Sequence, residues 1–204
     1  MDLRGIVFFV EGDTEIEFFK ALVQWLQLQE PQSGRSHRII YRNVKGIKNF
    51  QNKIVRIFNN QILRDNPGIT FDVVLCYDTD VFEYARKPPV DWNLVMADLK
   101  NAGANRVIHI KARYSIEDWF LKDYSGILTF LRLPQDTPLP GGTGIQKLKS
   151  LFKKANNVYI KGSNLKGFIQ QLDMGKIINE ITPELKPLIQ ALRMAQRQHG
   201  KNNH

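Results

Sequence analysis

The chain lacks the features of a secreted or membrane-spanning protein. It has one cysteine among 204 residues, Cys76, so no disulfide can form within it. Its longest apolar runs, such as residues 6–10 and 73–76, are far shorter than the ~20 apolar residues that cross a bilayer. The N-terminus has no long apolar segment followed by a small-residue cleavage site. We therefore expect a cytoplasmic protein with no membrane partner.

Two common kinds of site are also missing. No GxxxxGKS or GxxxxGKT sequence occurs, which excludes a P-loop nucleotide-binding site. The four histidines, at positions 37, 109, 199 and 204, do not have the spacing of zinc ligands. Cys76 lies inside an apolar run and is expected to be an inert core residue. Any metal ion is therefore expected to have oxygen ligands.

The composition is strongly basic. Lysine and arginine number 29 against 20 acidic residues, which gives a formal net charge of +9. Such an excess favours a polyanionic partner such as nucleic acid. Basic proteins that do not bind nucleic acid can have the same excess of lysine and arginine. Hydrophobic residues make up 43% of the chain, so a packed core can form.

Strand and helix signals alternate through the first half of the chain. Apolar runs rich in β-branched residues predict strands at residues 5–10, 39–44, 71–77 and 106–110. Apolar residues at helical spacing predict helices between them, near residues 16–26, 50–62 and 92–99. This alternation predicts an α/β fold with a mostly parallel, Rossmann-like sheet that is covered by helices.

In the second half of the chain, the sequence patterns predict helices and no strands. Residues 116–131 have a helical pattern with a break near Gly126, and further helical patterns follow a loop rich in proline and glycine at residues 134–144. We interpret residues 1–125 as an α/β domain and residues 126–204 as a helical extension packed on it. A separate domain that begins near Tyr114 is the alternative.

Acidic residues follow two of the predicted strands. Glu11, next to Gly12, follows the first strand, and Asp78 and Asp80 follow the third. Parallel sheets bind ligands at the carboxyl ends of their strands, so these carboxylates converge if the two strands are neighbours. Crowded carboxylates repel one another, and Mg²⁺ or Mn²⁺ relieves that repulsion. Acids after strands also occur simply as caps and turn residues.

The two acidic motifs resemble a known family. Glu11-Gly12 and Asp78-x-Asp80, each after an apolar strand, resemble the Toprim domain of topoisomerases, bacterial primases and nucleases of the OLD (overcoming lysogenisation defect) family. The longer motif Glu11-Gly12-x-x-Glu15 is similar to the nuclease branch. The resemblance implies that Glu11, Asp78 and Asp80 bind the metal ion, and that Glu15 is an additional acid for a second ion.

The resemblance covers residues 3–125 and includes a segment after the fourth strand. Residues 115–121 (SIEDWFL) resemble a motif of short, poorly characterised bacterial Toprim proteins, which implies that Glu117 faces the same site. Glu117 could equally be a surface acid, and Glu15 could serve only to stabilise a helix N-terminus. The chain departs from the family after Asp80, where the glycine of primases and of the 5S RNA maturase is missing.

Basic residues near the predicted site could bind phosphate. Lys111 and Arg113 leave the fourth strand close to the predicted acids. We expect Lys111 to stabilise negative charge in the transition state. The alternative is that Lys111 and Arg113 are simply solvent-exposed residues at the end of the strand.

These features predict a Mg²⁺-dependent endonuclease that hydrolyses phosphodiester bonds of nucleic acid, with DNA as the expected substrate. The resemblance implies a role in phage defence or a mobile element, and a separately encoded ATPase is a conceivable partner. Two alternatives stay open: a non-catalytic Toprim-like module that binds nucleic acid or a partner ATPase, and an RNA-processing endonuclease. The sequence has no topoisomerase, primase zinc or ATPase module, and it leaves open whether the chain forms a homo-oligomer.

Overall fold

A parallel sheet forms the centre of the protein, as the sequence predicts. A computed structural model describes residues 3–29, 38–80, 82, 88–161 and 166–197. The strands of this part of the chain are β1 (Leu3–Val10), β2 (Arg38–Asn43), β3 (Ile69–Asp78) and β4 (Arg106–Ala112). They lie in the order β2-β1-β3-β4. All neighbouring pairs are parallel, so the four carboxyl ends meet at one edge of the sheet.

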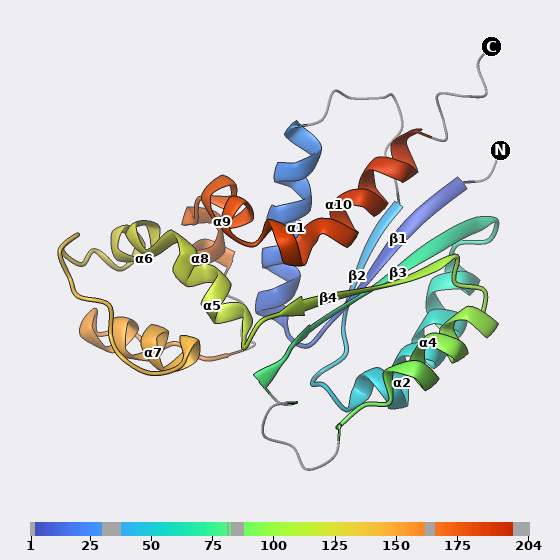
Figure 1. Cartoon of the computed structure of the whole chain (residues 1–204), viewed down its shortest axis with the longest axis horizontal. Helices are drawn as coiled ribbons and strands as arrows, with labels where there is room; N and C mark the ends of the chain where they lie inside the picture. Colours follow the sequence, from blue (N-terminus) through green and yellow to red (C-terminus); the bar gives the residue numbers. More distant parts are fainter. Residues whose placement is uncertain (1–2, 30–37, 81, 83–87, 162–165, 198–204) are drawn as a thin grey trace.

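Helices cover both faces of this sheet (Figure 1). On one face, α2 (Asn49–Ile57) continues into a π-helical turn at Phe58–Leu63 and packs beside α4 (Trp92–Asn101). On the other face lie α1 (Asp13–Gln29) and α10 (Thr182–Arg197), the latter against β4. The chain therefore has a mixed α/β fold of the Rossmann-like kind.

Side-chain alternation along β1 separates two hydrophobic cores. Ile6, Phe8 and Val10 belong to the core under α1, whereas Val7 and Phe9 belong to the core under α2 and α4. All five side chains are fully buried. A central parallel strand that is covered on both faces needs apolar residues at every position, which explains the continuous apolar run in the sequence.

The helical extension packs into the core under α1. It consists of α5 (Ile116–Phe120), a 3-10 turn at Leu121–Asp123, α6 (Tyr124–Leu131), α7 (Gly144–Lys154), α8 (Lys166–Gln171) and α9 (Met174–Glu180), followed by α10. Buried apolar residues of α6 to α10 join those of β1 and α1 in one continuous cluster. Among the helices that the structure describes, none combines the length and apolar character needed to traverse a membrane.

The break expected at Gly126 lies earlier in the chain. The 3-10 turn at Leu121–Asp123 interrupts the helix, and Gly126 lies in the first turn of α6. Asp123 causes the interruption because its side chain caps the new helix by accepting a hydrogen bond from Gly126 N. The sequence pattern also missed α9, which has only seven residues.

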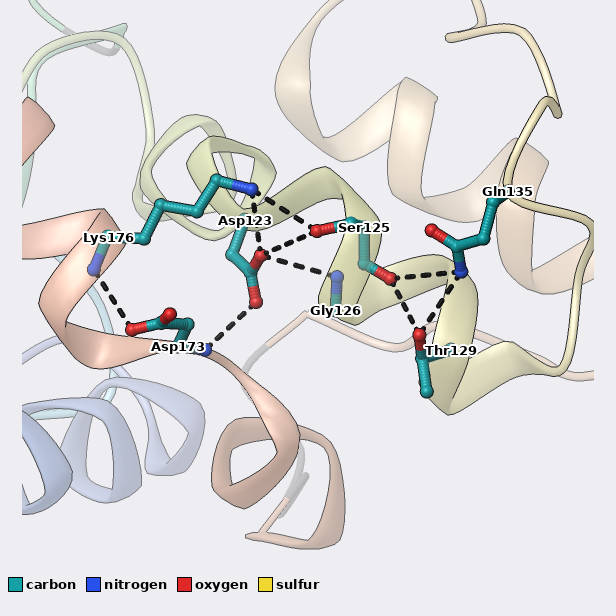
Figure 2. Close-up of polar contacts among 7 residues, drawn as sticks. All are labelled: Asp123, Ser125, Gly126, Thr129, Gln135, Asp173 and Lys176. Carbon is teal, nitrogen blue, oxygen red and sulfur yellow. Dashed lines mark hydrogen bonds and ion pairs between the residues drawn. The ribbon is translucent and has the colours of Figure 1, made fainter.

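Asp123 also joins α6 to α9 (Figure 2). Its buried carboxylate accepts hydrogen bonds from Asp173 N at 2.9 Å and from Lys176 Nζ at 3.2 Å. Lys176 Nζ also lies 3.2 Å from Ser125 Oγ. Burial by itself raises the pKa of Asp123, but the hydrogen bonds from Asp173 N and Lys176 outweigh it and lower the pKa below its ordinary value.

Candidate functional site

The structure brings Glu11 and Asp78 together at the carboxyl edge of the sheet. β1 and β3 are direct neighbours, with Phe9 paired to Leu75, so Glu11, which follows β1, lies beside Asp78, the last residue of β3. Asp78 N donates a hydrogen bond to Glu11 Oε1 at 3.0 Å. Two acidic residues that are 67 positions apart in the sequence are thus in direct contact.

Glu117 reaches the same place from the first turn of α5. Ile116 N donates a hydrogen bond to Asp78 Oδ1 at 2.9 Å, which holds this turn against the end of β3. Glu117 is fully buried, and its Oε1 accepts a hydrogen bond from Tyr159 OH at 3.0 Å. The tyrosine therefore fixes one oxygen of Glu117 and leaves the other, Oε2, without a hydrogen-bond partner among the described residues.

The positive charge next to these acids belongs to Lys161, which sequence reasoning missed as a site residue. Its Nζ lies 2.6 Å from Asp78 Oδ2 and 3.9 Å from Glu117 Oε2. Burial by itself lowers the pKa of Lys161, but the two carboxylates outweigh it and raise the pKa above its ordinary value. Lys161 lies outside any regular element and 83 positions from Asp78, so no local sequence pattern indicates this contact.

Two further acids complete what we call the acid cluster: Glu11, Glu15, Asp78, Asp80 and Glu117. Glu15 lies in the first turn of α1 and is 5% exposed, within electrostatic range of Glu11 and Glu117. Asp80 follows β3 and acts electrostatically on Glu11 and Lys161. Glu15 Oε2 and Asp80 Oδ1 are buried oxygens with no hydrogen-bond partner in the described part of the chain.

A small cavity lies among these side chains. Its volume is about 10 Å³, and its walls include Glu11, Glu15, Asp78 and Trp119. Such a space is about the size of one water molecule. Glu15 Oε2 and Trp119 Nε1 have no hydrogen-bond partner within the described ranges, so the wall offers both an acceptor and a donor.

The acid cluster is electrostatically unfavourable. Burial raises the pKa of Asp78 to about 8, even though Lys161 opposes the shift, and raises the pKa of Glu15 to about 7. Burial also raises the pKa of Glu11, against the effect of the hydrogen bond from Asp78 N. Buried carboxyl groups that share one ammonium group do not stabilise a fold. Shifts of this kind are typical of functional sites.

Lys111, which we expected beside the acids, faces the other side of the sheet. Its neighbours Ile110 and Ala112 point into the core under α1, so Lys111 points away from that core, on the side of His109. Its side chain is exposed and forms no ion pair with the acid cluster within the ranges that the structure describes. The lysine that contacts the acids is Lys161.

The acid cluster suits a hard cation in its chemistry, although it is not arranged as a metal cage. Among the described residues, no three His, Cys, Asp or Glu side chains are placed to hold a metal ion together. Glu15 Oε2, Asp80 Oδ1 and Glu117 Oε2 accept no hydrogen bond from the described residues, and they are carboxylate oxygens, which Mg²⁺ and Mn²⁺ prefer. The ammonium group of Lys161 supplies compensating charge beside them.

Fold and site together define a parallel α/β protein with a buried acid cluster at the carboxyl edge of its sheet. No protein-family model, curated protein or solved structure matches this chain. The resemblance to Toprim domains therefore depends on the acidic motifs and on their positions after β1 and β3, and it stays a prediction.

Proposed function

We propose that this chain is a Mg²⁺-dependent endonuclease that hydrolyses phosphodiester bonds of nucleic acid, with DNA as its substrate and the cytoplasm as its location. The acid cluster is the observation that carries the proposal. Glu11 directly after β1, Asp78 at the end of β3 and Glu117 after β4 come from distant parts of the sequence and meet beside Lys161. Because burying these acids costs folding free energy, their presence is best explained by a function that needs them.

The residues of the cluster have the properties that phosphodiester hydrolysis requires. Glu11, Asp78 and Asp80 would hold Mg²⁺, with Glu15 and Glu117 as supporting ligands. When bound, Mg²⁺ supplies positive charge that stabilises a transferring phosphoryl group.

Lys161 adds a second source of positive charge. Its raised pKa keeps the ammonium group charged, and its side chain is 37% exposed, so it can contact both the cluster and a ligand outside it. A phosphate oxygen that gains negative charge during hydrolysis would be stabilised by this group. The overall charge of +9 favours the approach of such a polyanion.

A non-catalytic module is the second candidate, and Lys161 is the residue that favours it. Its ammonium group already compensates Asp78 and Glu117, so the cluster is partly neutralised without a metal ion. In that case the chain would bind nucleic acid or a partner ATPase without cleaving anything. An RNA-processing endonuclease differs from the proposal only in its substrate.

Cleavage assays distinguish these functions. Plasmid DNA, single-stranded DNA and RNA are incubated with the protein and either Mg²⁺ or Mn²⁺. We expect Asp78→Asn and Glu11→Gln to reduce cleavage at least about 100-fold, since even groups that only support a metal ligand typically contribute 10–100-fold. Asp136→Asn, an exposed acid in the loop before α7, is the matched control and should cleave normally. Cleavage that survives Asp78→Asn would show that the site is wrong.

Thermal unfolding tests metal binding without relying on activity. Mg²⁺ should raise the melting temperature of the wild-type protein, because a ligand that binds only the folded state stabilises it. Asp78→Asn should abolish this response. Lys161→Met should enlarge it, because the competing ammonium group is gone, whereas Lys176→Met, which breaks the ion pair with Asp123, should not. A protein that neither cleaves nor responds to Mg²⁺ or Mn²⁺ is the non-catalytic module.

A further inference from the structure

Two residues with a left-handed backbone flank the acid cluster. Lys45 (φ 61°) lies two positions after the end of β2, and Tyr114 (φ 65°) lies two positions after the end of β4. Because the strand order is β2-β1-β3-β4, they stand at the two ends of the row of strand ends, with Glu11 and Asp78 between them. This conformation is unfavourable for lysine and tyrosine. Strained residues of this kind cluster at functional sites.

The backbone of Tyr114 is bonded to the loop that carries Asp80. Its carbonyl oxygen accepts hydrogen bonds from Thr79 N at 3.1 Å and Asp80 N at 3.0 Å, and its N–H donates to Thr79 Oγ1 at 2.9 Å. Glycine or asparagine would make the same bonds with less strain. The ring does not offset the strain by packing, since 46% of Tyr114 is exposed. Packing in the core of this chain therefore does not explain why a tyrosine occupies position 114.

The surroundings of the Tyr114 ring suit an unpaired base. The guanidinium group of Arg113 lies 5.4 Å from the ring centroid, and Arg113 is itself exposed. Proteins bind single strands by stacking bases on aromatic rings while neighbouring cations contact the phosphates. A base inside a duplex is already stacked between its neighbours, whereas an unpaired base can place its free face on the ring.

Lys45 offers a phosphate contact at the other end of the row. Its backbone is fixed, because Lys45 N donates to Asn43 Oδ1 and Lys45 O accepts from Asn49 Nδ2, both at 2.7 Å, while its side chain is exposed. The next residue, Gly46, donates to Glu11 O at 3.1 Å. At about 4.8 Å per strand the row spans about 14 Å, roughly four stacked nucleotides at about 3.4 Å each.

We propose that the sheet edge binds an unpaired segment of nucleic acid laid across the strand ends, with one base stacked on Tyr114 and a phosphate paired with Lys45. The phosphodiester bonds between these two contacts then lie over the acid cluster. The inference rests on the proposed function, and it narrows the substrate class to single strands and unpaired positions in duplexes. Stacking holds the strand without reading its sequence.

Equilibrium binding in the presence of a chelator tests the stacking contact. Variants are made in an Asp78→Asn background and mixed with a labelled oligonucleotide, as a single strand or as the matching duplex. Tyr114→Asn keeps the left-handed preference and removes the ring, so we expect single-strand binding to weaken roughly 5- to 150-fold and duplex binding to stay the same. Tyr114→Phe should bind like the parent. Leu139→Asn, which removes a 52% exposed apolar side chain in the loop before α7, is the control.

The same assay tests Lys45. Lys45→Ala should weaken binding of single strands and lower the slope of log affinity against log salt concentration by about one. Lys153→Ala, an exposed lysine at the end of α7, should leave that slope unchanged. A fluorescent base analogue such as 2-aminopurine reports stacking directly, because its emission is quenched on the parent and should recover on Tyr114→Asn.

Two results with the variants would overturn the inference: a Tyr114→Asn variant that folds and binds single strands as tightly as the parent, or a Tyr114→Phe variant that binds as weakly as Tyr114→Asn. A third is that polyglutamate displaces the labelled single strand as well as an unlabelled single strand does. The two proposals fail separately. A wild-type protein that never cleaves but shows a Tyr114-dependent preference for single strands contradicts only the nuclease. A protein whose cleavage depends on Asp78 but whose binding ignores Tyr114 contradicts only the stacking contact.

Discussion

At position 126 the fold has no room for a side chain. A Cβ there would lie 1.9 Å from Asp123 Oδ2, the oxygen that accepts the hydrogen bond from Asp173 N (Figure 2). Alanine in place of glycine normally stabilises a helix by about 1 kcal/mol. We expect Gly126→Ala instead to destabilise the protein by about 2–4 kcal/mol, because the buried carboxylate must leave its partners. Urea unfolding measures the difference.

The control for Gly126→Ala is Gly167→Ala in α8, where an added Cβ meets no heavy atom within 4 Å. This substitution should leave stability unchanged or raise it by up to about 1 kcal/mol. Equal effects of the two substitutions would contradict the close packing of Gly126 against Asp123.

Glu15 is expected to make stability depend on pH. Burial raises its pKa from 4.5 to about 7, so the folded state holds the proton more tightly than the unfolded state does. Its contribution to stability is therefore complete below about pH 4.5 and is lost as the pH rises to about 7. Between about pH 4.5 and 7, the free energy of unfolding of the wild-type protein should therefore fall by up to about 3 kcal/mol through this group, and Glu15→Gln should lack that fall. Urea unfolding over that pH range, with a chelator present, measures it.

Glu180→Gln is the matched control, because Glu180 is exposed at the end of α9. Its pH profile should superimpose on that of the wild-type protein. If the Glu15→Gln profile did the same, Glu15 would not be the group that titrates.

The candidate site could be predicted only in part from single residues. Glu11 and Asp78 could be predicted because each comes directly after an apolar run that predicts a strand, and neighbouring parallel strands bring their carboxyl ends together. Lys161 was missed because its position depends on how the segment after α7 returns to the sheet edge. Lys111 was expected at the site from its place along β4, although its alternation with Ile110 and Ala112 indicates the opposite face.

At the scale of elements, the strength of each local signal decided what could be predicted. β1 and β3 contain continuous apolar runs, residues 6–10 and 73–76, which are typical of strands buried on both faces. The short helix α9 has too few residues to show a periodic pattern. The end of α5 depends on the capping by Asp123, which also needs partners from α9 and so cannot be read locally. Sheet order likewise had to come from the structure.

The helix α10 is expected to contribute strongly to stability, although it comes last in the chain. It packs against β4, and its residue Leu188 is fully buried in the core under α1. Leu188→Ala should destabilise the protein by about 2–5 kcal/mol, through lost burial and the cavity that it leaves. Leu28→Ala, at a position that is 70% exposed at the end of α1, should change stability by less than about 0.5 kcal/mol. Urea unfolding compares them, and similar values would show that α10 is loosely attached.

Across the whole molecule, charge is distributed unevenly. The chain carries a formal charge of +9, yet acids gather at one edge of the sheet with Lys161 as their ion-pair partner. A basic surface attracts a polyanion over long distances, whereas a local group of carboxylates repels its phosphates. Mg²⁺ or Lys161 must offset that repulsion for a phosphodiester bond to reach the acid cluster. In the proposed function, the long-range charge would attract the nucleic acid, and the acid cluster with Lys161 would act on it after contact.

The two halves of the chain are expected to unfold together. The core under α1 contains residues from Ile6 to Leu192, so the helical extension cannot leave without exposing β1 and α1. Trp119 lies in this core and Trp92 packs against the core on the other face of the sheet. Tryptophan fluorescence and far-ultraviolet circular dichroism should therefore give coincident urea unfolding curves with one transition. A separate domain beginning near Tyr114 would instead lose helical signal in a transition of its own, while Trp92 still reported a folded environment.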